Sequence, residues 1–139
     1  MELSEYISRI REISRLKKML DLEESILSSP TIEDVGKIDE VFGYCREGYM
    51  ELHPGSGMER RTISRQFLFI ILYFFSPKAL SGGKMRVGIR DNLARLLETT
   101  AENVSHYSSD LMFLYETYED FSGDVNELFS YVVKRLKNK

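Results

Sequence analysis

The sequence predicts an all-α protein, a compact helical domain of about six helices. Three observations support this fold class. Apolar residues recur at spacings of three and four in the segments between breaks, which is typical of one face of a helix. Residues 3–28 contain neither Gly nor Pro. Breaks at Pro30, at Pro54 and at the pair Gly82–Gly83 leave segments of helical length between them.

Length and composition indicate one globular domain. The chain has 139 residues, 42% of them hydrophobic, which is enough for a core. The single Cys45 excludes an internal disulfide framework and suits a reducing cytoplasm. The N-terminus has no apolar signal segment, and the longest apolar run, residues 67–75, is far shorter than the roughly 20 residues that span a bilayer. We therefore expect a cytoplasmic protein without membrane contact.

Residues 3–28 form the longest helical pattern. An apolar seam with heptad spacing is interrupted at Lys17 and Glu24. The apolar members of the seam are Leu3, Tyr6, Ile10, Ile13, Leu20 and Leu27. Two interpretations are open: a helix packed on its own domain, which we favour, or a helix that forms a homodimer.

The next helix is expected to begin with Thr31 as its N-cap and to end near Arg46. The glycines and proline of residues 51–61 then predict a linker or mobile loop. The chain is thus divided into N-terminal helices in residues 1–50, a linker or loop in residues 51–61, and a C-terminal helical region in residues 62–139.

Four further helices are predicted in residues 62–139, and the second of them is the first helix of the hairpin in residues 90–109. Residues 62–76 could form a buried strand, but their length and context favour a central helix that begins at Thr62 or Ser64. Residues 101–118 are expected to form one helix of ~27 Å. A break at residues 121–124 precedes the last helix.

Charge is divided unevenly along the chain, although the net charge is only −3. Residues 1–59 carry −6 and residues 96–139 carry −4, whereas residues 60–95 carry +7. The bases of this block are Arg60, Arg61, Arg65, Lys78, Lys84, Arg86, Arg90 and Arg95. Local positive charge is what phosphate binding requires. The alternative is that these Lys and Arg side chains only make loops and helix faces soluble.

Residues 90–109 read as two helices joined by a tight turn, with a polar outer face on the second helix. The small Ala94 stands at the fifth position of this stretch, and Leu97 and Val104 at the eighth and fifteenth would close an apolar wedge. The pattern resembles a helix-turn-helix, whose second helix lies in the DNA major groove. A plain structural hairpin satisfies the same pattern.

Glu98 is the departure from that pattern. The ninth position usually carries Gly, because the turn needs a left-handed backbone there. A non-Gly residue in that conformation costs roughly 1–2 kcal/mol. We therefore expect a looser or differently shaped turn at Glu98.

The region from Ile63 to Leu114 resembles the superfamily of Trp-repressor-like and replication-initiator C-terminal domains, without indicating one family within it. The likeness rests on Arg65-Gln66 in the helix before the turn and on the segment that begins at Thr100 and includes Ser105-His106. It implies binding of double-stranded DNA by residues 62–139. We expect base contacts from Thr100, Glu102, Ser105, His106 and Ser109, and phosphate contacts from Arg60, Arg61, Arg65, Lys84, Arg86, Arg90 and Arg95.

The sequence therefore predicts a small DNA-binding protein, either a transcriptional regulator or an accessory protein of a mobile element or of replication. The alternative is a helical protein–protein interaction module. We do not expect an enzyme, because no nucleophile–base set or catalytic motif is found. No cofactor, metal or small-molecule ligand is expected either, and His53 lacks partners for a metal site.

Overall fold

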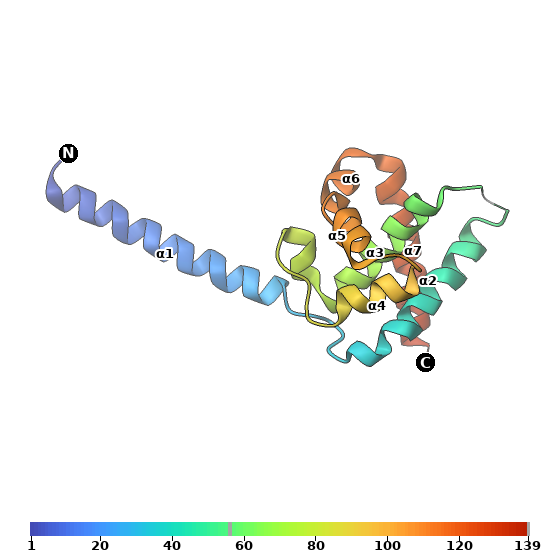
Figure 1. Ribbon diagram of the computed structural model, residues 1–139. Coiled ribbons are helices and arrows are strands. Elements are labelled where there is room, and N and C mark those ends of the chain that lie inside the picture. The colour runs from blue at the N-terminus through green and yellow to red at the C-terminus, as the bar shows by residue number, and fades with distance from the viewer. Residues whose placement is uncertain (56, 139) are drawn as a thin grey trace.

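The computed structural model describes residues 1–55 and 57–138, and no strand occurs among them. The all-α fold class is confirmed: six helices form a compact body, and a seventh, α1, projects from it (Figure 1). In chain order the α-helices are α1 (Leu3–Leu27), α2 (Ile38–Leu52), α3 (Arg60–Phe75), α4 (Ile89–Leu96), α5 (Ala101–Ser108), α6 (Leu111–Thr117) and α7 (Glu119–Lys137). Two short 3₁₀ helices, η1 (Val35–Lys37) and η2 (Pro77–Ser81), precede α2 and follow α3.

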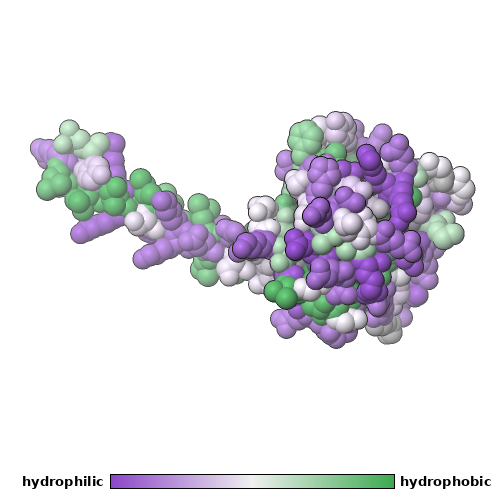
Figure 2. Space-filling model, viewed as in Figure 1, coloured by the Kyte–Doolittle hydropathy of each residue, from purple (hydrophilic) through white to green (hydrophobic). Residues whose placement is uncertain are grey.

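Helix α1 has the predicted length but not the favoured packing. None of its 25 residues is buried. It extends as a rod away from the body (Figure 1), and apolar side chains alternate with polar ones along it (Figure 2). The expectation that this helix packs on its own domain is therefore wrong.

The segment before α2 is extended where a helix was predicted. Thr31 is not the N-cap of a helix. The chain runs along the C-terminal end of α3 instead, and the backbone N–H of Ile32 donates to the carbonyl of Phe74 at 2.9 Å. Asp34 caps instead, accepting from the backbone N–H of Gly36 at 2.9 Å to begin η1.

Helix α2 continues to Leu52, beyond the predicted end at Arg46. The absence of a side chain at Gly48 lets α7 pack closely against this C-terminal part of α2. A Cβ at position 48 would lie 2.6 Å from the ring of Tyr131 and 2.9 Å from Leu128. The loop between α2 and α3 is correspondingly shorter than residues 51–61, and Ser56 within it lies outside the described residues.

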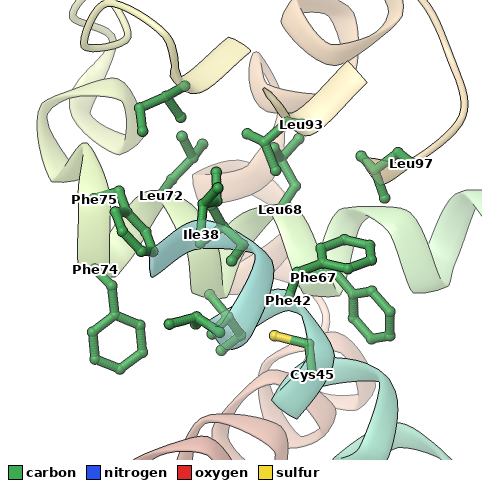
Figure 3. Packing of buried hydrophobic residues seen from close by; sticks show 14 of the residues in the cluster. Ile38, Phe42, Cys45, Phe67, Leu68, Leu72, Phe74, Phe75, Leu93 and Leu97 are labelled. Carbon is green, nitrogen blue, oxygen red and sulfur yellow. The ribbon is translucent and has the colours of Figure 1, made fainter. Parts of the chain in front are cut away.

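Helix α3 is the centre of the core, which confirms the helical interpretation of residues 62–76. It begins at Arg60, and neither Thr62 nor Ser64 is its N-cap. Phe67 meets Phe42 of α2 edge-on at 5.4 Å between ring centroids, with Cys45 and Leu68 nearby (Figure 3). A single apolar cluster joins α3 to residues of every other helix in the body. The body therefore includes α2 as well as α3–α7.

The helix boundaries in the C-terminal half differ from the prediction at two places. The helix expected over 101–118 is two helices, separated at Ser109 and Asp110. The hydroxyl of Ser109 donates to the carbonyl of His106 at 2.7 Å, and the carboxylate of Asp110 accepts from Arg65 of α3 at 3.3 Å. Conversely, α7 runs without interruption through residues 121–124, and the break lies at Tyr118, whose backbone is extended.

No helix among the described residues is long and apolar enough to cross a membrane. The longest apolar run lies in α3, where most of its side chains face the core.

Candidate nucleic-acid interface

Helix α4 and helix α5 form a hairpin on the body. Ile89 and Leu93 of α4 and Val104 of α5 are fully buried, and Leu97 is 7% exposed. Ala94 and Tyr107 pack against the same core and are half-buried. The residues expected to form the wedge between the helices therefore face inward, and the opposite side of the hairpin is free. That side lies on a largely hydrophilic face of the body (Figure 2).

The turn between the helices has the left-handed geometry that the pattern demands. Glu98 has φ = +54°, the only positive φ of a non-Gly residue among those described. The N–H of Thr99 donates to the carbonyl of Ala94 at 2.9 Å, and the N–H of Glu98 donates to that of Arg95 at 3.3 Å. These two bonds define a Schellman motif, with Glu98 at the position usually held by Gly. The expectation of a looser or differently shaped turn is wrong.

Arg60 supplies a contact that the sequence did not reveal. Its guanidinium donates to the carbonyl of Leu97 at 2.8 Å and lies 3.6 Å from the carboxylate of Glu98. A side chain at the start of α3 thus holds the turn from outside. This engagement gives Arg60 a structural role beside the expected phosphate contact.

Thr100 caps α5, as a threonine at this position favours. Its hydroxyl oxygen accepts from the backbone N–H of Asn103 at 3.1 Å. The side-chain amide of Asn103 donates to the hydroxyl of Thr99 at 2.8 Å. The start of α5 is therefore stabilised by the side chains of Thr100 and Asn103.

The residues expected to contact bases lie on α5 and at its ends. Glu102, His106 and Ser109 are exposed, as is the cap residue Thr100. Ser105 is half-buried, and its hydroxyl lies 3.4 Å from the guanidinium of Arg90. The structure thus places hydroxyl, imidazole and carboxylate groups on one helix, and the hydroxyl of Ser105 beside a cation of α4.

A cleft of about 720 Å³ lies beside this helix. One wall is the loop of residues 82–88 together with the start of α4, and the other is the C-terminal end of α5. It brings together Lys84, Arg86 and Arg90, which are expected to contact phosphates, with Ser105 and Ser109, which are expected to contact bases. Asp91 and the half-buried Ser108 also line it. Ser108 was missed, although its spacing from Ser105 is that of one helix face.

Not all predicted phosphate contacts are equally available. Lys84, Arg61 and Arg90 are exposed. Arg95 is exposed too, and it lies 2.7 Å from Asp39 of α2, an ion pair in solvent.

Arg65 and Arg86 face inward instead. Arg65 pairs with Asp110 at 3.3 Å and stacks over the ring of Tyr107 at 4.9 Å. Arg86 donates to the carbonyls of Phe75 and Ile32, each at 3.2 Å, and to that of Glu33. Arg86 therefore ties the segment after α1 to the body, and we do not include Arg65 or Arg86 in the proposed contacts.

The described residues contain no group of three or more His, Cys, Asp and Glu side chains placed to hold a metal ion. The thiol of Cys45 is fully buried among apolar side chains, and this burial raises its pKa far above the usual range. A buried thiol of this kind is inert as a nucleophile.

No family model, no curated protein and no solved structure matches the chain.

Proposed function

We propose that this protein binds double-stranded DNA through the α4–α5 hairpin, with α5 as the recognition helix of a helix-turn-helix. The observation that carries the proposal is the cleft, in which Lys84 and Arg90 lie beside the hydroxyls of Ser105 and Ser109. Cations next to short polar side chains on an exposed helix suit simultaneous contact with a phosphate backbone and a base edge.

The turn supports the same proposal. A left-handed residue costs free energy when it is not Gly, and here Glu98 adopts that conformation with a complete set of turn hydrogen bonds. The hairpin therefore keeps a particular angle between α4 and α5 although the sequence disfavours it. A fixed second helix is what insertion into a groove requires.

In this proposal Arg60, Arg61, Lys84, Arg90 and Arg95 contact phosphates, and Ser105, His106 and Ser109 reach base edges. Thr100 keeps its capping bond and contributes its remaining hydroxyl proton. Glu102 accepts from the amino group of cytosine. The protein would act as a transcriptional regulator or as an accessory protein of a mobile element or of replication.

Fluorescence anisotropy on a random duplex tests the proposal. Binding should weaken steeply as salt rises, because each phosphate contact releases condensed counterions. The variant Lys84→Ala/Arg90→Ala should lower the salt slope by about two, at ~0.9 per contact. The control Lys134→Ala/Lys137→Ala removes the same charge from the C-terminal end of α7 and should leave the slope unchanged.

Base contacts are tested by selecting bound sequences from a random pool. His106→Ala and Ser105→Ala should alter the selected sequence, whereas Arg61→Ala should weaken binding to all sequences alike. Absence of binding to any duplex at ~50 mM salt would contradict the proposal, since nonspecific affinity is greatest there.

A second candidate function, a helical protein–protein interaction module, is favoured by the unburied rod of α1. In that case the hairpin would contact protein, and the exposed cations would give no salt-dependent binding to DNA.

A further inference from the structure

Helix α1 has a large apolar surface and no partner within the described chain. Its apolar side chains are between 40% and 78% exposed, the extremes being Ile7 and Leu27. The chain that follows is anchored by Ile32 and by the bonds of Arg86, so the rod leaves the body from a fixed point. In proteins most helical stability comes from the packing of an apolar face. We therefore expect the apolar face of α1 to be buried against another surface.

We propose that α1 pairs with α1 of a second copy as an antiparallel two-stranded coiled coil. The contact surface is the seam, defined as Leu3, Tyr6, Ile10, Ile13, Lys17, Leu20, Glu24 and Leu27. Its alternating three- and four-residue spacing is that of a heptad repeat. The inference concerns α1 alone and does not rest on DNA binding.

The two charged members of the seam decide the orientation. In a parallel pair each seam residue faces its own copy, so Lys17 would face Lys17 and Glu24 would face Glu24. Two like-charged contacts would then interrupt the apolar surface. In an antiparallel pair with full overlap, residues whose numbers add up to 30 face each other. Lys17 then meets Ile13, and Glu24 meets Tyr6.

The same register pairs the remaining apolar members of the seam. Leu3 faces Leu27, and Ile10 faces Leu20, each contact occurring twice by symmetry. The stem of Lys17 can cover Ile13 while its ammonium group reaches solvent.

Residues beside the seam favour the antiparallel orientation as well. Arg9 and Glu23 occupy equivalent flanking positions two heptads apart. Antiparallel pairing brings Arg9 of one copy next to Glu23 of the other, again twice. In a parallel pair Arg9 would lie near Ser14 and form no ion pair. Flanking charges are known to set the orientation of coiled coils.

Two leucines offer a matched test, because Leu20 and Leu22 are each 64% exposed. Leu20 belongs to the seam, whereas Leu22 lies on the opposite side of the helix. Sedimentation equilibrium should give twice the 16.2 kDa mass for the native chain and for Leu22→Asp. Leu20→Asp should weaken self-association at least tenfold. The near-ultraviolet circular dichroism of the body should be unchanged in both variants, because α1 buries no residue.

Equal effects of the two substitutions, or a native chain that stays monomeric, would overturn the proposal. A monomer that co-sediments with anionic phospholipid vesicles would assign the apolar surface to lipid instead. In all these cases the DNA-binding measurement remains separate, because it is read from the hairpin variants.

Cross-linking with a short bismaleimide tests the orientation. Ser14 lies near the two-fold axis of the antiparallel pair, so Ser14→Cys should link two copies. Leu3→Cys should not, because its two copies would be ~36 Å apart. The native Cys45 is 0% exposed and stays out of the reaction. Linkage through position 3 would show a parallel pair and refute the proposed orientation.

Charge reversal provides an independent test of register. Arg9→Glu and Glu23→Arg should each weaken association, and the two together should restore it. A double variant that is weaker than either single one would refute the pairing of Arg9 with Glu23.

Discussion

Replacing Glu98 measures how much strain the hairpin turn holds. Relief of the left-handed conformation by Gly is worth about 1–2 kcal/mol. The greater freedom of Gly in the unfolded chain offsets about 0.4–1 kcal/mol of this. Both Glu98→Gly and Glu98→Ala lose the contact with Arg60, whose side chain is 71% exposed and whose pairing energy is small. The difference between the two variants therefore isolates the backbone, and Gly should be the more stable by about 0.5–1 kcal/mol.

Thermal and urea unfolding followed by near-ultraviolet circular dichroism would report this difference. The signal comes mostly from core aromatic residues, since α1 contributes only the exposed Tyr6. One kcal/mol corresponds to ~4 °C in melting temperature for a body of this size. If Glu98→Ala equalled or exceeded Glu98→Gly in stability, the left-handed geometry at position 98 would be refuted.

Three further predictions concern contacts between α2 and α7 and the attachment of the segment after α1 to the body. Gly48→Ala should destabilise the body by about 1–3 kcal/mol, because its Cβ would lie 2.6 Å from α7; Gly43→Ala on the same helix meets nothing within 4 Å and should be neutral or stabilising in urea unfolding. Arg86→Ala should cost about 1–3 kcal/mol by leaving carbonyls unpaired, and limited proteolysis should then cleave between α1 and α2. Hydrogen bonds from Arg135 and Tyr131 lower the pKa of Glu47, so its contribution to stability is present above the usual Glu pKa and is lost as pH falls through the lowered value. Acid titration of unfolding should show Glu47→Gln converging with the native chain, and an unchanged difference would contradict that linkage.

Local patterns predicted most helices but not their ends. The existence of α1 and α7 follows from apolar periodicity, and that of α3 from the length and helical context of its apolar run. The cap at Thr100 follows from the identity of one residue. The division between α5 and α6 depends on Arg65, which lies 45 positions before its partner Asp110. No local window contains that pair, so a single helix was the natural expectation.

The candidate interface likewise has parts that local patterns predict and parts that depend on distant residues. Periodicity correctly placed the inward residues of the hairpin, such as Val104. Charge alone could not distinguish the exposed Arg90 from Arg86, because the carbonyls that bind Arg86 belong to residues 32, 33 and 75. A regular left-handed turn was not expected at Glu98, because the preference for Gly at that position reflects only the free-energy cost of the conformation to other residues. That preference does not include the support that Arg60 gives from another helix.

The pairing of α2 with α7 also affects how the chain folds. Glu47 and Arg135 are 88 positions apart, and the contacts of Gly48 span a similar distance. Helical proteins usually fold quickly because their contacts are local. Here the body is complete only after a loop of this length has closed, which costs entropy before any contact of α2 with α7 forms. We therefore expect slower folding than in a bundle of successive helix pairs, with the rate sensitive to Gly48→Ala only if this pairing is already present in the transition state.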